Sequence, residues 1–150
     1  MICSDGEKIT GLSFVSSLPP HQAHTASPIF EEADEWLDIY FSGKSPGFLP
    51  SLKICGTEFQ KSVYGIMLTI PFGQVMTYSE IAAVIAGRRG SPGMSAQAVG
   101  GASSRNRIAL MIPCHRVIGK NGSLTGYAGG LERKRRLLEL EGIDTSKLLA

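Results

Sequence analysis

Cysteine is scarce in this chain, with only three residues, at positions 3, 55 and 114. An odd number of cysteines without a Cys-x-x-Cys pair fits neither a disulfide framework nor the ligand spacing of a structural zinc site. Zinc binding by Cys3, His21 and His24 is open in principle, but their irregular spacing favours a surface segment without a metal. The sequence therefore predicts reduced thiols, no metal and no cofactor.

Long apolar runs are also absent. A membrane-spanning helix needs a stretch of about 18 apolar residues, and none occurs. The first residues include Asp5, Glu7 and Lys8, where a secretory peptide would have its apolar stretch. These absences predict a soluble protein of the cytoplasm, or of the nucleus in a eukaryote, with no membrane partner.

Basic residues are few in the N-terminal third of the chain and more frequent in the rest. Residues 1–55 contain three lysines and seven acidic residues, a net charge of −4, whereas residues 56–150 contain twelve basic and six acidic residues, a net charge of +6. The C-terminal part is therefore the candidate for binding a polyanion such as nucleic acid. An ordinary solvated basic surface explains the charge alone equally well.

Residues 1–50 are predicted to form a small α/β domain. The apolar residues around 9–15 indicate a short sheet remnant or a hairpin. Ser27 and Pro28 are typical of a helix N-cap and first turn, so a helix should extend through Phe41. Its buried face is predicted from helical spacing: Phe30, Ala33, Trp36, Leu37 and Tyr40. Residues 43–50 then have the composition of a linker.

Two capping boxes begin the C-terminal part, predicted as a second domain over residues 56–150. Thr57 with Gln60, and Thr77 with Glu80, can each exchange side-chain and backbone hydrogen bonds at a helix start. The first helix should end before Pro71, and the second near Gly87.

A third short helix, roughly residues 95–103, consists almost wholly of small residues. Glycines 100 and 101 give it poor helix propensity and little apolar bulk. Such a helix suits close approach to a partner surface, such as a groove of DNA. Together with the preceding helix it forms a predicted helix-turn-helix.

Two more elements are expected beyond this motif. The apolar run at 108–112 has the length of a buried strand and is stopped by Pro113. A last helix should extend from Leu131 to about Gly142.

The segment Pro113–Val117 contains the main candidate for chemistry. Adjacent Cys114 and His115 cannot meet on a regular strand, because successive side chains point to opposite faces. A hydrogen bond between them requires irregular backbone or a bridging water. Taken alone, the segment is better explained by a structural cysteine beside a core histidine.

A carboxylate on the last helix strengthens the catalytic interpretation. On a helical wheel of about 100° per residue, Glu141 falls about 40° from Leu137, inside the apolar arc with Leu131 and Leu138. A buried carboxylate needs a partner. His115 would give a carboxylate that orients a histidine that activates a thiol; an ion pair with Arg116 or another arginine is the alternative.

Four segments together carry a family resemblance. IPCHRV at 112–117, TYSEIA at 77–82, AVGGA at 98–102 and YAGGL at 127–131 resemble the O6-alkylguanine-DNA alkyltransferases, or methylated-DNA–[protein]-cysteine S-methyltransferases. The likeness is specific from residue 56 to residue 142 and weak before that.

The resemblance implies an α+β fold. Its C-terminal domain would be helical, with a winged-helix-like helix-turn-helix that enters the minor groove. The N-terminal domain would be similar to ribonuclease H, shortened here and lacking its first strand. The partner would be double-stranded DNA that contains O6-alkylguanine or O4-alkylthymine, bound by a monomer.

The family's functional residues match positions of this sequence. Cys114 would accept the alkyl group irreversibly in a single turnover, with His115 as its water-linked base, Glu141 orienting the histidine and Asn106 tying the recognition helix to the active-site turn. Tyr78 would turn the nucleotide out of the stack, although half-buried packing also explains Tyr78 and Tyr127. The donors to guanine O6 would be Tyr127 and the backbone N–H of Ala128, and the Cys114 and Val117 carbonyls would accept from the exocyclic amine. The residues expected to contact DNA are Ala96, Gln97, Ala98, Gly100, Gly101 and Arg105.

Two positions depart from the family pattern. Gln97 stands where many members have an arginine that fills the space of the flipped base, and Ala109 stands where some have a proline lining the pocket. A cysteine hydrolase or a DNA-binding regulator without transfer activity are the competing hypotheses. The hydrolase leaves the glycine-rich helix unexplained, and the regulator leaves the Cys-His pair and Glu141 unexplained.

Overall fold

The computed structural model describes residues 1–17 and 26–149. His21 and His24, considered above as zinc ligands beside Cys3, lie outside this range. Within it, no group of three or more His, Cys, Asp or Glu side chains is arranged to hold a metal ion. None of its helices combines the length and apolarity needed to cross a bilayer. The fold is α+β, with helices and two very small sheets.

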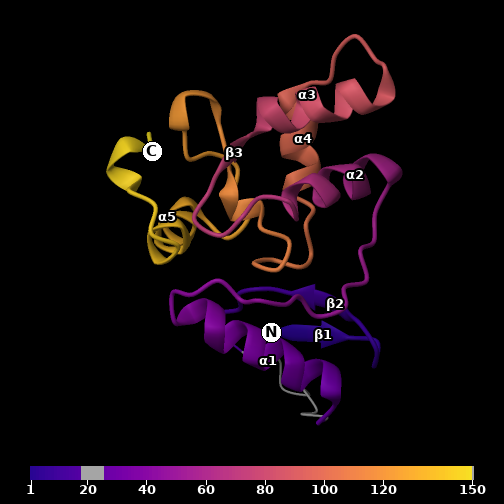
Figure 1. Cartoon of the computed structure of the whole chain (residues 1–150), viewed down its shortest axis with the longest axis vertical. Helices are drawn as coiled ribbons and strands as arrows, with labels where there is room; N and C mark the ends of the chain where they lie inside the picture. Colours follow the sequence, from indigo (N-terminus) through magenta and orange to yellow (C-terminus); the bar gives the residue numbers. More distant parts are fainter. Residues whose placement is uncertain (18–25, 150) are drawn as a thin grey trace.

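The N-terminal part forms one layer of the molecule (Figure 1). Strands β1 (Ile2–Ser4) and β2 (Ile9–Leu12) pair as an antiparallel hairpin, as predicted. Helix α1 (Pro28–Phe41) packs against β1 and buries a face of four residues, Ile29, Ala33, Trp36 and Tyr40. Phe30 and Leu37, also predicted on this face, are only half-buried.

The hairpin also contacts the C-terminal part through its backbone. The Leu12 N–H donates to the Arg107 carbonyl at 2.9 Å, and the Ala109 N–H donates to the Leu12 carbonyl at 2.9 Å. The edge of β2 is therefore attached to the segment that leads into Cys114.

Both predicted capping boxes are formed. Thr57 and Gln60 begin helix α2 (Glu58–Met67), and Thr77 and Glu80 begin helix α3 (Tyr78–Arg89). Helix α3 ends two residues beyond the predicted end, because Gly90, at φ 60°, supplies the left-handed C-cap.

Helix α4 (Ala96–Ser103) is the predicted small-residue helix, with the Ser95 hydroxyl accepting from its first free N–H groups. It packs against both α2 and α3 (Figure 1). Its buried side consists of Val99, Ala102 and Ser103. The helix-turn-helix predicted from the sequence is therefore present as α3, a loop and α4.

The predicted strand at 108–112 is wrong. Only Ile108 forms a β-bridge, to Leu12, and the chain then turns, with Leu110 at φ 67°. The run is apolar because most of its side chains are buried in the core. A buried turn and a buried strand have the same apolar composition, so the sequence alone does not distinguish them.

The remaining elements surround the Cys-His segment. A 3-10 turn, η1 (Cys114–Arg116), leads into β4 (Val117–Ile118), which pairs in parallel with β3 (Met76–Thr77). Short 3-10 turns follow at η2 (Lys120–Gly122) and η3 (Thr145–Lys147), on either side of α5 (Leu131–Leu140).

Two side chains of α5 differ from the helical-wheel prediction. Leu131 is 45% exposed, because it is the first residue of the helix and lies before the part that packs on the core, whereas Lys134 is fully buried. On the wheel Lys134 lies about 60° from Leu137, inside the arc that contains Glu141. A lysine inside this apolar arc is the feature of the sequence from which a buried, functional Lys134 could have been predicted.

Candidate active site

The Cys-His pair lies on irregular backbone. Pro113 and the 3-10 turn that follows place Cys114, His115 and Arg116 in the protein interior, with at most 8% of each residue exposed. Within the described residues no direct hydrogen bond joins Cys114 to His115, although the backbone here is irregular.

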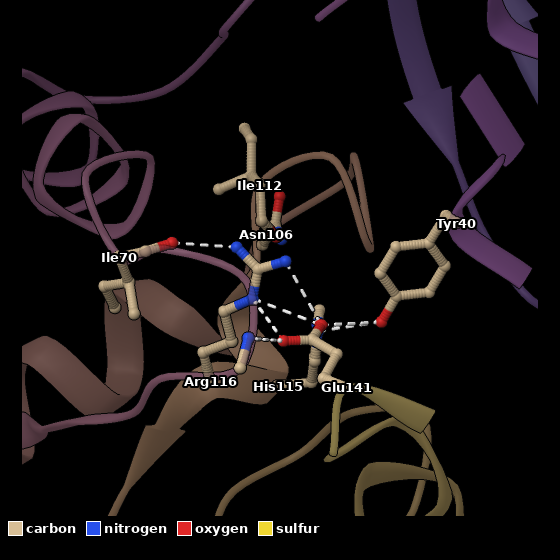
Figure 2. A network of polar contacts seen from close by, with 8 residues as sticks. Tyr40, Ile70, Asn106, Ile112, His115, Arg116 and Glu141 are labelled. Carbon is tan, nitrogen blue, oxygen red and sulfur yellow. Dashed lines mark hydrogen bonds and ion pairs between the residues drawn. The ribbon is translucent and has the colours of Figure 1, made fainter. Parts of the chain in front are cut away.

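Glu141, directly after α5, is the centre of a buried polar network (Figure 2). Its Oε1 accepts from His115 Nε2 at 2.6 Å, and its Oε2 accepts from Arg116 Nε at 2.9 Å. The Gly73 backbone N–H also donates to Oε2, at 3.0 Å. The two partners considered as alternatives are therefore both present, and Glu141 binds His115 and Arg116 together.

Tyr40 completes this network from the N-terminal helix. Its hydroxyl donates to Glu141 Oε1 at 2.8 Å and lies 3.1 Å from His115 Nε2. Arg116 is held further by its bond to the Ile70 carbonyl at 2.8 Å. The helical spacing predicted that Tyr40 is buried, but gave no sign that its hydroxyl reaches the histidine.

The protonation states follow from these contacts. Burial alone would raise the pKa of Glu141, but hydrogen bonds from His115 and Arg116 lower it to about 2. Burial lowers the pKa of His115 against the opposing influence of Glu141. A neutral His115 beside an ionised carboxylate must place its proton on Nε2, which leaves Nδ1 as an acceptor. Nδ1 is buried and has no partner among the described residues.

Asn106 connects the segment after α4 to the thiol. Its Nδ2 donates to the Ile112 carbonyl at 2.8 Å and to Cys114 Sγ at 3.2 Å, while its Oδ1 accepts from the Ile108 N–H at 3.0 Å. Burial raises the pKa of the Cys114 thiol, and the Asn106 amide and the Lys134 charge oppose that rise. The side chain therefore both fixes the turn before Cys114 and favours its thiolate.

The two tyrosines predicted to bind substrate differ in their surroundings. The Tyr78 hydroxyl donates to the Thr125 carbonyl at 3.1 Å, and burial raises the pKa of Tyr78 to about 12. The Tyr127 hydroxyl is buried and has no partner among the described residues. Burial and then the charge of Cys114 raise the pKa of Tyr127. Two unpartnered polar groups, the Tyr127 hydroxyl and His115 Nδ1, are thus available inside the protein.

Lys134 is a further polar residue of this region that sequence reasoning missed. Its Nζ donates to the Val117 carbonyl at 2.5 Å and to the Thr125 carbonyl at 2.8 Å, and burial lowers its pKa to about 8. Val117, whose carbonyl was predicted to accept from the guanine amine, therefore has that carbonyl engaged by the lysine here. Ala128 lies exposed on the turn before α5.

The residues predicted to contact DNA include the exposed side of α4. Gln97, Ala98 and Gly101 are exposed, and Ala96 and Gly100 are half-buried. Arg105 is exposed just after the helix, and its guanidinium has no hydrogen-bond partner within the described residues. The structure thus separates the predicted residues into a buried thiol site and an exposed helix surface, which Asn106 connects.

Comparisons with known proteins agree with this geometry. Residues 58–143 match the family model described as the DNA-binding domain of 6-O-methylguanine DNA methyltransferase. The methylated-DNA–protein-cysteine methyltransferase of Mycobacterium leprae is 54% identical over 112 residues, which are 75% of this chain but just under two thirds, 65%, of that protein. The protein of the same name from Mycobacterium tuberculosis H37Rv is 44% identical over 143 residues, covering 93% of this chain and 84% of that protein.

The fold is similar to a solved structure of the same kind. The crystal structure of Mycobacterium tuberculosis OGT in complex with DNA superimposes with a TM-score of 0.76 and 42% identity. The match covers 99% of this chain and 88% of the other.

Proposed function

The chain belongs to the 6-O-methylguanine DNA methyltransferase family, and on that basis we propose that it repairs alkylated DNA by direct reversal, taking the alkyl group of an O6-alkylated guanine onto its own Cys114. The observation that carries this proposal is that Asn106 donates to the Cys114 thiol while the next residue, His115, is paired with the buried Glu141. The substrate is double-stranded DNA that contains O6-alkylguanine, and O4-alkylthymine is a second candidate lesion. The reaction needs no cofactor.

DNA binding is assigned to the helix-turn-helix. The exposed small residues of α4 let its backbone approach the floor of the minor groove, and Arg105 contacts a phosphate. The damaged guanine is then turned out of the duplex at a cost of a few kcal/mol, which is lowest for a poorly paired base. Tyr78 assists this step by pressing on the nucleotide.

The transfer step then uses the buried network. Cys114 gives its proton, through a bridging water, to Nδ1 of His115, and the resulting imidazolium is stabilised by Glu141. The thiolate attacks the alkyl carbon, so that an S–C bond forms while the C–O6 bond breaks. The Tyr127 hydroxyl and the Ala128 N–H stabilise the negative charge on guanine O6. The guanine then takes up one proton from water while the His115 imidazolium releases one, so that the proton of Cys114 is accounted for. The product is a thioether, whose S–C bond does not exchange with thiols as a disulfide does, so each molecule reacts once.

Positioning contributes more to the rate than thiolate formation does. A free thiol with a pKa of about 8.5 is roughly 7% ionised near pH 7.4, so full ionisation would gain at most about 14-fold. Lowering the pKa by about three units would cost roughly 16- to 30-fold in nucleophilicity, if the dependence known for thiol–disulfide exchange applies. The larger effects are the in-line placement of Cys114 and the donors to the leaving oxygen.

The same family supports a finer description of the architecture. We assign residues 1–50 to a shortened domain similar to ribonuclease H, of which the β1–β2 hairpin and α1 are the core. Residues 56–150 are assigned to a winged-helix-like domain that binds DNA and performs transfer. The protein acts as a monomer in the compartment that contains the cell's DNA.

Transfer from labelled O6-methylguanine duplex DNA tests the function. With excess DNA, label on the protein should reach one alkyl group per molecule and stop, and mass spectrometry should place it on Cys114. Cys55 is exposed, so Cys55→Ser is the matched control and should leave transfer unchanged, whereas Cys114→Ser should abolish it. Continued turnover would instead support a cysteine hydrolase, and label on Cys55 would indicate nonspecific thiol alkylation.

A further inference from the structure

Tyr40 lies outside the segment that matches the family model, and yet its hydroxyl is part of the His115–Glu141 network. It belongs to α1, separated from Glu141 by 101 residues, and it is fully buried. No other residue of the N-terminal part hydrogen-bonds to this network within the described residues (Figure 2). Its contribution is therefore a property of the tertiary structure.

The direction of each hydrogen bond follows from the charges. Glu141 is ionised and accepts only, so the Tyr40 hydroxyl must donate to Oε1. That leaves a lone pair of the Tyr40 oxygen facing His115 Nε2, 3.1 Å away. The Nε2 proton then has two acceptors, the carboxylate oxygen and the phenol oxygen. The other charged and titratable groups that act on Tyr40 are Arg116 and Tyr127.

The Tyr40 ring is held in place from several sides. Trp36 stacks on it with ring centroids 5.3 Å apart and planes 5° apart. Phe72 meets it edge-on at 5.9 Å, and the His115 ring does so at 6.2 Å. A ring held in this way gives its hydroxyl a single position, which is what a positioning group requires.

We propose that Tyr40 is a positioning residue of the alkyl-transfer reaction. Together with Glu141, its hydroxyl holds the Nε2 edge of the His115 imidazole in one orientation, so that Nδ1 stays free to accept the Cys114 proton. The N-terminal part of the chain thereby completes the active site. This inference rests on the proposed function.

Tyr40→Phe removes the hydroxyl and keeps the stacked ring. Transfer is measured under single-turnover conditions with the free O6-alkylated base, so that DNA binding does not enter. The rate should fall roughly tenfold or more, the effect of losing one hydrogen bond to a charged group. Affinity for duplex DNA should not change.

The tautomer of His115 provides an independent readout. The chain has only three histidines, so the ¹⁵N spectrum of the imidazoles is simple enough to assign. The wild-type protein should show His115 protonated at Nε2 alone, and Tyr40→Phe should shift the Nε2 resonance, because the proton on Nε2 loses one of its two acceptors. Protonation at Nδ1 in the wild-type protein would overturn the proposal without any variant.

Tyr64→Phe is the matched control. Tyr64 is also buried, and its hydroxyl donates to the Ala102 carbonyl at 3.0 Å, with no hydrogen bond to His115 or Glu141 within the described residues. This variant should lose stability but keep the wild-type rate with the free base and the wild-type His115 spectrum. The proposal fails if Tyr40→Phe slows transfer no more than Tyr64→Phe, or slows it with an unchanged His115 spectrum. A wild-type protein that accepts no alkyl group would refute the proposed function instead.

Discussion

At the scale of the residue, the Glu141 carboxylate has two tasks. It orients His115, and it neutralises Arg116, whose guanidinium is buried with it. Removing one member of a buried ion pair leaves an uncompensated charge, whereas removing both is often nearly neutral. Any variant of Glu141 therefore changes both stability and chemistry, and the two effects need to be separated.

Glu141→Gln should raise the apparent pKa of Cys114 and slow transfer, with little change in DNA affinity. It should also destabilise the fold by about 3–5 kcal/mol, because Arg116 loses its partner. Single-turnover transfer across pH, together with denaturant unfolding, measures both effects. The double variant Glu141→Gln, Arg116→Met should recover much of the stability and still transfer slowly. A pH profile of Glu141→Gln identical to that of the wild type would reject the Glu–His–Cys relay.

The lowered pKa of Glu141 also predicts a loss of stability in acid. The pKa is about 2 in the folded protein against 4.5 for the free group, so the folded state binds this proton less readily. The contribution, about 3 kcal/mol, should be present above pH 4.5 and be lost as the pH falls toward 2. The difference between the unfolding free energies of the wild type and of Glu141→Gln, measured across this pH range, gives the contribution of Glu141. A difference that does not depend on pH in this window would contradict the assignment.

At the scale of the element, the glycines of α4 have no steric reason within the protein itself. A methyl group added at Gly101 would meet nothing within 4 Å, although glycine lowers helix stability. We therefore expect the missing side chain at Gly101 to leave room for a partner molecule, and DNA is the proposed partner.

Gly101→Ala should accordingly stabilise the free protein by about 0.5–1 kcal/mol and weaken DNA binding. Gly65 in α2 is also exposed and unhindered, so Gly65→Ala should give the same stabilisation with unchanged DNA affinity. Thermal unfolding and duplex titrations measure the two quantities. Equal affinities for the two variants would place α4 outside the DNA interface.

Gln97, exposed near the start of α4, is expected to enter the duplex as a weak wedge. Its amide can hydrogen-bond to the orphaned base, but it stacks less well than a guanidinium and adds no charge. Gln97→Ala should slow transfer from duplex DNA more than transfer from the free modified base, which has nothing to flip. Gln97→Arg should match or exceed the wild type on duplex DNA. Equal losses on both substrates for Gln97→Ala would mean that Gln97 supports the fold.

At the scale of the whole molecule, charge and structure divide the chain differently. The charge separates an acidic part before residue 56 from a basic part after it. The contacts join these parts, through the backbone bonds of Leu12, through Tyr40, and through Arg133 over the Phe14 ring at 4.5 Å. The acidic part therefore supports the active site while the basic part faces the polyanion.

DNA affinity should consequently fall with salt, with a log–log slope of about −0.9 for each phosphate neutralised. Arg105→Gln should make that slope less steep by about the 0.9 that corresponds to one phosphate contact. Cys114→Ser should keep the wild-type slope while abolishing transfer. If Cys114→Ser also loses DNA binding, the cysteine is structural and the site assignment is wrong.

The sequence by itself determined the features that depend on near neighbours. Both capping boxes and the start of every long helix were predictable, because caps and hydrophobic periodicity act within a few residues. The Cys-His pair and the place of Glu141 on an apolar arc were readable for the same reason.

Only the tertiary structure decided what the buried groups meet. The turn at Leu110, the shared use of Glu141 by His115 and Arg116, and the carbonyls that hold Lys134 depend on how the helices pack. Tyr40 is the clearest case, because its partner Glu141 is 101 residues away and no local pattern distinguishes a packed phenol from one that holds a histidine. Periodicity shows which face is buried, but the partner of a buried polar group is set by the fold that surrounds it.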